Sequence, residues 1–161
     1  MKRIRFFLAL LAVLVILPRP ASAQEADSPP EWRGPGRFCG LGPIIDVTGD
    51  ERIQSLTGGM HSGSFRWSGG FGTLLVRGIA WAAKPPGRAL AQRTSKGHIL
   101  FAERRERGGY TVALWNGDNG AAYFTSPQRL TSAQRAAIDR VDLFNEGEEP
   151  KGCTYRTVFS Y

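Results

Sequence analysis

The sequence lacks the short motifs that mark the common enzyme classes. It has no G-x-S-x-G nucleophile elbow, no H-E-x-x-H zinc motif, no C-x-x-C pair, no Walker A loop and no G-x-G-x-x-G dinucleotide fingerprint. Their absence removes the usual sequence support for serine hydrolases, zinc peptidases, dithiol oxidoreductases and nucleotide-dependent enzymes. The sequence therefore favours a protein that is not an enzyme, and it predicts no cofactor.

Histidine is nearly as scarce, with His61 and His98 as the two examples. His61 lies in a Gly/Ser-rich stretch, Thr57–Ser64, where a loop residue would be accessible and a serine is close in sequence. His98 stands at the start of a predicted strand. These two residues are the weak catalytic candidates for a small hydrolase. Asp46 and Asp118 do not complete a zinc-ligand spacing with them, so no metal site is predicted.

A long apolar run is found at the N-terminus, and it has the pattern of a secretory signal peptide. Lys2, Arg3 and Arg5 precede the unbroken apolar stretch Phe6–Leu17, and Ala21-Ser22-Ala23 is a small-residue cleavage pattern. The alternative is a retained membrane anchor, but the apolar stretch is short for a full span. We expect residues 1–23 to be removed, a mature chain from about Gln24, a periplasmic or secreted location, and no membrane span after cleavage.

Cleavage changes the meaning of the formal charge of +7. Residues 1–23 contain four of the 21 basic residues and no acidic one, so the mature chain keeps 17 basic residues against 14 acidic, a net of +3. That balance is ordinary for a soluble domain and gives no reason to expect nucleic-acid binding. The remaining 138 residues suit one domain.

Cysteine is also scarce, with Cys39 and Cys153 near the two ends of the mature chain. In an exported protein an even pair predicts a disulfide. A redox-active pair is the alternative, but it normally needs closer spacing. We expect a structural disulfide that joins the first ordered segment to the last.

The most apolar stretch of the mature chain is Phe71–Ala83. Its glycines and the turn residues on both sides favour a strand over a buried helix. Because neither alternating half of it is polar, it predicts a strand that is covered on both faces. Residues 24–37 are rich in proline, glycine and charge and are expected to form a disordered lead-in, with Trp32 as a possible anchor.

The rest of the chain, 38–161, predicts a single α+β domain. Further short strands are separated by the turns Gly108-Gly109 and Asn116–Gly120, Asp50–Leu56 is irregular or one helical turn, and Thr131–Phe144 has a capping box and an apolar helical stripe. We expect an antiparallel sheet of about six strands, with this helix in the C-terminal half packed on one face. A partly closed barrel is the alternative.

The predicted binding residues lie around one hairpin turn. Trp115 falls on the less apolar face of its strand, beside Asn116, Asp118 and Asn119. An accessible tryptophan next to amide and carboxylate groups is suited to a sugar or a protein partner. The alternatives are that the helix covers Trp115 and that Asn116–Gly120 is simply a tight turn, rather than a calcium loop, for which ligands are missing.

Three functions follow from these observations. The first is non-enzymatic binding of an envelope protein or polysaccharide, to which Arg104, Arg105 and Arg107 would contribute if the partner were anionic. The second is a small extracytoplasmic hydrolase that uses His61 or His98. The third is an inhibitor or assembly accessory protein that acts through the Thr57–Ser64 loop.

Overall fold

A computed structural model describes residues 30–145, 147–148 and 150–156 of the chain. The predicted signal peptide and most of the predicted lead-in lie outside these residues. Within them the protein is built from two β-sheets and one short helix, and that helix is too short to cross a membrane. Residues 30–37, at the end of the predicted lead-in, contain one strand and the start of the next.

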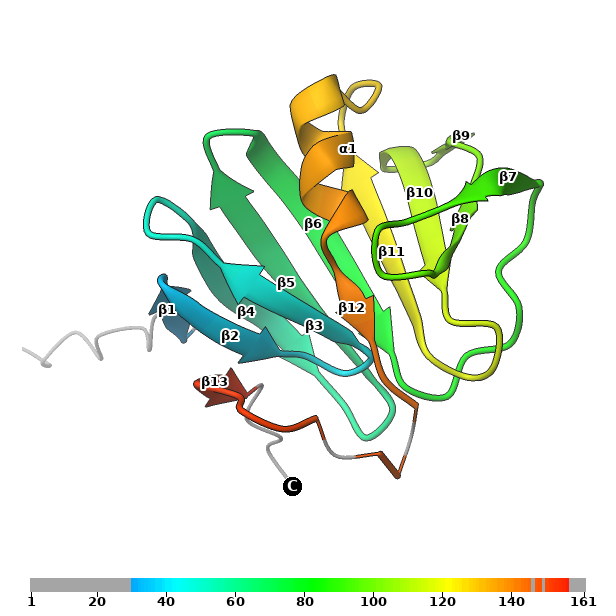
Figure 1. Cartoon of the computed structure of the whole chain (residues 1–161). Coiled ribbons are helices and arrows are strands. Elements are labelled where there is room, and N and C mark those ends of the chain that lie inside the picture. Colours follow the sequence, from blue (N-terminus) through cyan, green and yellow to red (C-terminus); the bar gives the residue numbers. More distant parts are fainter. Residues whose placement is uncertain (1–29, 146, 149, 157–161) are drawn as a thin grey trace, which may run out of the picture.

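The larger sheet is antiparallel and has nine strands in the order β1-β4-β5-β6-β11-β10-β8-β7, with β9 also paired to β10 (Figure 1). Its strands are β1 (Glu31–Arg33), β4 (Arg52–Gly58), β5 (Ser62–Gly69), β6 (Gly72–Ile79), β7 (Ala89–Arg93), β8 (Ile99–Phe101), β9 (Arg104–Glu106), β10 (Gly109–Trp115) and β11 (Ala121–Ser126). After β6 the chain crosses to the far edge and returns through β10 and β11 to pair with β6 again. The predicted central strand is thus confirmed, as are the hairpins at Gly108-Gly109 and Asn116–Gly120.

The smaller sheet has the order β12-β3-β2-β13 and lies across one face of the larger one (Figure 1). It consists of β2 (Gly36–Cys39), β3 (Pro43–Val47), β12 (Asp142–Leu143) and β13 (Tyr155–Arg156). The predicted disulfide between Cys39 and Cys153 is present, and it joins β2 to the segment just before β13. The first and last parts of the described chain are therefore held side by side.

The main core lies between the two sheets. Large side chains from the nine-stranded sheet, among them Phe65 and Trp67, are almost completely buried against Phe38 and Ile45 of the smaller sheet. The rings of Phe38 and Phe65 meet edge to face at 4.8 Å. Trp32 packs on its own domain, because its ring stacks on Tyr155 at 5.5 Å. These contacts explain how a chain with little helix buries a substantial apolar surface.

The only helix of the described residues, α1 (Ser132–Asp139), begins with the predicted capping box at Thr131 and Gln134. It is shorter than the predicted Thr131–Phe144, because the chain turns at Arg140 and then forms β12. Ile138 contributes its side chain to the main core. The helix thus fills one end of the space between the sheets (Figure 1).

The predicted fold class is wrong. The protein is mostly β, with a nine-stranded sheet and a second sheet, rather than α+β with one sheet of about six strands. The physical reason is that a second sheet, and not a helix, provides most of the cover over the first. Asp50–Leu56, predicted as irregular or helical, mostly belongs to β4. The barrel alternative also fails for the described residues, since the large sheet ends in the edges β1 and β7.

Candidate functional site

The two faces of the large sheet are covered unequally. On β6 the side chains of Leu74 and Val76 point toward the second sheet and have no exposed surface, whereas Leu75 on the other face is 46% exposed. Arg77 and Trp81 also lie on this second face and are exposed. The prediction that β6 is covered on both faces is therefore wrong. We call the uncovered side of the sheet around β5, β6 and β11 the open face.

Strand register brings polar residues from distant parts of the sequence together on the open face. Arg77 of β6 stands directly opposite Ser64 of β5 and Tyr123 of β11. Side chains directly opposite one another in an antiparallel pair are close enough to interact. The side chains of Arg77 and Tyr123 are therefore neighbours, although the two residues belong to different hairpins.

A second row lies beside the first. Leu75 pairs with Thr125, Thr125 with Thr111, and Thr111 with Arg104 of β9. The hydroxyl oxygens of Thr111 and Thr125 are 2.9 Å apart, within hydrogen-bonding distance. The two rows together place the apolar side chain of Leu75 beside hydroxyl groups and two arginines.

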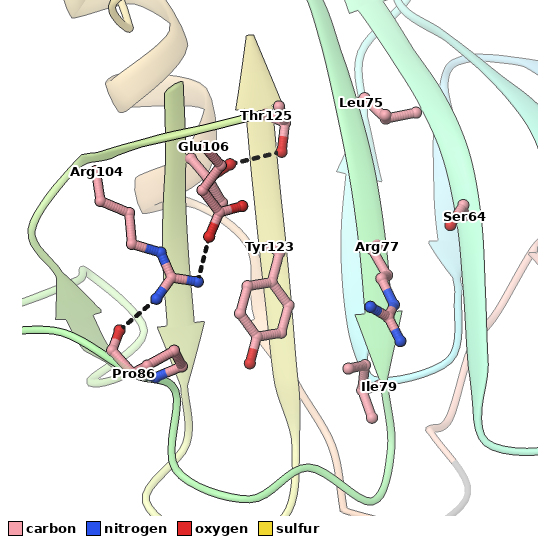
Figure 2. Close-up of a pocket in the computed structure, with 10 residues that line it drawn as sticks. Ser64, Leu75, Arg77, Ile79, Pro86, Arg104, Glu106, Tyr123 and Thr125 are labelled. Carbon is pink, nitrogen blue, oxygen red and sulfur yellow. Dashed lines mark hydrogen bonds and ion pairs between the residues drawn. The ribbon is translucent and has the colours of Figure 1, made fainter. Parts of the chain in front are cut away.

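These rows form the floor of a groove with a volume of about 410 Å³. The side chains that line it come from β5, β6, β9, β10, β11 and the connection that follows β6: Ser64, Leu75, Arg77, Ile79, Pro86, Arg104, Glu106, Thr111, Tyr123 and Thr125. Figure 2 shows the ring of Tyr123 between the side chains of Arg104 and Arg77. The volume falls within the range of small-molecule sites in proteins.

The two arginines of the groove differ in their partners. Arg104 is held in place, because its guanidinium lies 2.6 Å from the Glu106 carboxylate and donates to the Pro86 carbonyl at 2.9 Å (Figure 2). Arg77 makes no hydrogen bond or ion pair with any described residue. A guanidinium has five N–H donors and no acceptor. The donors of Arg77 are thus directed at solvent in the groove.

Tyr123 has a raised pKa. Burial of the phenol is the main cause, and the nearby charges of Arg104 and Arg77 act in the opposite direction. Burial disfavours the charged phenolate. The phenol therefore keeps its proton at neutral pH and is available as a hydrogen-bond donor beside Arg77.

His61 directly precedes β5, at the tip of the β4–β5 hairpin. The stretch Thr57–Ser64 is less of a loop than predicted, since β4 continues to Gly58 and β5 begins at Ser62. At the tip Met60 is 76% exposed, and Trp81, which is 66% exposed, meets the His61 ring at 5.4 Å. His61 thus contacts one exposed apolar side chain and directly follows another in the sequence.

His98 has a different environment, since it is buried near the start of β8. Its Nε2 lies 2.7 Å from the Asp142 carboxylate and 3.1 Å from the Leu143 backbone nitrogen. Its backbone N–H donates to the Thr94 hydroxyl. These contacts attach the turn before β8 to β12. Among the described residues no three His, Cys, Asp or Glu side chains are placed to hold a metal ion.

The predicted binding residues at the hairpin turn are largely engaged within it. Trp115 is half-buried, and its indole N–H donates to the Asp118 carbonyl at 2.8 Å. The Asn116 side-chain oxygen accepts from the backbone N–H groups of Asp118 and Gly120, and its amide nitrogen donates to Asn145. Asn119 also donates its backbone N–H to Asn145. Helix α1 packs on the opposite side of the sheet from Trp115, so it is not what covers this ring.

Sequence reasoning did not identify the groove. Arg104 had been singled out within a charged run, but Arg105 faces the other side of β9 and Arg107 lies in the turn, so neither lines the groove. The available signal was Arg77, a charged residue between Leu75 and Ile79 on one face of an apolar strand. Comparison of the chain with protein-family models, with curated proteins and with solved structures finds no match.

Proposed function

We propose that the protein is an exported, non-enzymatic binding domain that holds an envelope component or a protein partner in the groove of the open face. The signal-peptide pattern of residues 1–23 supports export. The Cys39–Cys153 disulfide is consistent with an oxidising, extracytoplasmic compartment.

The observation on which this proposal depends is the position of Arg77 and its lack of a hydrogen-bond or ion-pair partner among the described residues. Its guanidinium has no protein partner within the described residues, yet it stands between Leu75 and Ile79 at the floor of a groove. A protein that needed only solubility on this face would have no use for large apolar side chains beside the charge. Apolar walls around an available cation are instead typical of a ligand site.

The hydrolase alternative has less geometric support. His98 has a carboxylate in reach, but it is buried and does not line the groove. His61 lies at the tip of the β4–β5 hairpin and also does not line it. A general base must reach the proton that it abstracts from a bound substrate. Neither histidine is positioned to do so in this groove.

Photo-crosslinking tests the proposal directly. A photoreactive residue is introduced in place of Leu75 on the groove wall, and in a second variant in place of Arg105, which lies on β9 of the same sheet but outside the groove. We expect one discrete adduct from envelope extract at position 75, none at position 105, and loss of the adduct when Arg77→Ala is added. Equal adducts at the two positions, or no adduct at position 75, would rule out the groove as the binding site.

A second candidate function rests on the exposed hairpin tip. Met60 and Trp81 are the two most exposed large apolar side chains among the described residues; Met60 directly precedes His61 in the sequence, and the Trp81 ring meets the His61 ring. Exposed apolar groups in close proximity mark protein-binding surfaces. This favours the inhibitor or accessory alternative. Met60→Ser combined with Trp81→Ser should then abolish partner capture while Arg77→Ala leaves it intact, and the opposite result would favour the groove.

A further inference from the structure

We infer that the groove of the open face selects a small monocarboxylate with an apolar body. This inference rests on the proposed binding function and specifies the chemical class of the ligand. It follows from three properties of the groove: its net charge, the shape of its available cation and the distribution of its apolar walls.

The side chains that line the groove carry a net positive charge, which a ligand with a single negative charge would neutralise. Its lining contains two cations, Arg77 and Arg104, and one anion, Glu106. Arg104 and Glu106 are paired at 2.6 Å, which leaves the positive charge of Arg77 as the uncompensated one. A dianionic phosphate would retain an uncompensated charge in the same groove as Glu106, and like charges placed together are unfavourable. A monoanion is therefore the better electrostatic match.

The donors of the groove fit a carboxylate. The guanidinium of Arg77 presents a planar fork of N–H donors that binds two carboxylate oxygens at once. Tyr123, its direct cross-strand neighbour, has a phenol whose O–H makes no hydrogen bond with a described residue. Together they offer donors from two strands to one planar anion. An amine or ammonium head would instead face the Arg77 cation and be repelled.

The apolar side chains of the groove indicate that the rest of the ligand, away from its carboxylate, is apolar. Leu75 and Ile79 lie two residues on either side of Arg77 on β6, and Pro86 lies on the wall formed by the connection after β6. A volume of about 410 Å³ lies within the range of small-molecule sites and leaves room for a ligand larger than acetate. Acetate would leave these walls uncovered, whereas an eight-carbon chain would cover them. Each buried methylene adds a favourable transfer free energy.

The test compares four probes that differ in one feature each. Octanoate has the predicted head and body, octanol lacks the charge, octylammonium reverses it, and acetate lacks the body. Each is titrated into the mature protein while backbone amide NMR shifts of β6 and β11 are followed. We expect octanoate to shift these amides and to bind at least tenfold more tightly than each of the other three.

Variants tie the preference to the proposed residues. Arg77→Ala should weaken octanoate at least tenfold and abolish its advantage over octanol, and Tyr123→Phe should weaken it severalfold. Arg105→Ala removes the same charge outside the groove and should leave octanoate binding unchanged. Because Arg77 and Arg105 are both exposed, the same spectra verify that the variants remain folded.

The possible failures are distinguishable. If octanol binds in the groove as tightly as octanoate, or if Arg77→Ala has no effect on the preference, the carboxylate inference is overturned and the groove remains a binding site. If none of the probes shifts the amides of β6 and β11, the inference is also overturned. Photo-crosslinking at position 75 then decides separately whether the proposed function survives with a ligand of another class.

Discussion

The two faces of the nine-stranded sheet are made from the same strands and differ in what lies on them. Toward the second sheet, Trp67, Leu74 and Phe124 have no exposed surface. On the open face, Leu75 is 46% exposed and Arg77 is also exposed. Successive side chains of a strand point to opposite faces. Neighbouring residues can therefore be changed to affect stability alone or binding alone.

The largest effect is expected at Gly78, where the β2–β3 connection and the start of β3 pack directly against the backbone of β6. A β-carbon at this position would lie 2.1 Å from the Leu41 carbonyl oxygen and 2.3 Å from a ring carbon of Pro43. Gly78→Val must push the sheets apart, so we expect the free energy of unfolding to fall by more than about 3 kcal/mol. Chemical denaturation of the variant and of the unchanged protein measures this difference in the free energy of unfolding.

Arg77→Ala is the matched control, one residue away and on the open face. It should change the free energy of unfolding by no more than about 0.5 kcal/mol, because an exposed side chain without partners is removed. Equal destabilisation by the two substitutions would contradict the separation between a structural face and a binding face.

The disulfide gives the next largest effect. It closes a loop with a sequence separation of 114, and the chain-entropy model gives an upper limit of about 4.7 kcal/mol, with about 3 kcal/mol typical in practice. Replacing Cys39 and Cys153 by serine should therefore cost about 3 kcal/mol, measured by urea denaturation. Because the bond lies within the smaller sheet, hydrogen exchange should increase in β2 and not in β11. Faster exchange in both strands to the same extent would show that the two sheets unfold as one unit.

Local features of this fold were predictable from the sequence, because each depends on nearby residues. The capping box at Thr131 and Gln134, the turn at Asn116–Gly120 and the strand that became β6 are all specified within a few positions. The disulfide was predictable because there were two cysteines and one pairing.

The division into two sheets was not predictable in the same way. Strand patterns in Phe38–Val47 and around Tyr155 do not say which sheet the strands join, since that depends on pairing between distant segments. Arg140 illustrates the same limit. It follows the end of α1 and pairs with Glu51, which is distant in the sequence.

The candidate site escaped sequence reasoning for a related reason. Leu75 and Ile79 were interpreted as buried because apolar residues usually are, and composition does not say whether anything covers them. Arg77 and Tyr123 become neighbours only through the pairing of β6 with β11, which follows a long excursion of the chain. Register therefore had to be known before the groove could be recognised.

A third prediction compares one carboxylate–arginine pair on each side of the sheet. Glu51 is buried, pairs with Arg140, and accepts a hydrogen bond from the Trp67 indole at 3.0 Å. Glu106 pairs with Arg104 on the open face, where its side chain is 43% exposed. Breaking a buried ion pair is far more costly than breaking an exposed one.

Glu51→Gln should therefore lower the free energy of unfolding by about 2 kcal/mol, and Glu106→Gln by less than about 1 kcal/mol. Thermal denaturation of both variants at one pH and ionic strength provides the comparison. A larger loss for Glu106→Gln would mean that the open face, and not the covered one, holds the structure together.

The smallest effect is expected from an exposed pair on the smaller sheet, Arg37 and Asp46. A hydrogen bond from Arg37 is the main cause that holds the pKa of Asp46 below its ordinary value of 3.8, and partial burial opposes it. Because the pKa is lower in the folded protein, the pair stabilises fully above about pH 4, and this contribution is lost as the pH falls through the folded pKa. Asp46→Asn should lower stability by less than about 1 kcal/mol at pH 7, and by progressively less as the pH falls below about 4. Urea denaturation of both proteins across that range measures the difference, and a gap that does not narrow as the pH falls would assign the effect of the substitution to packing and not to charge.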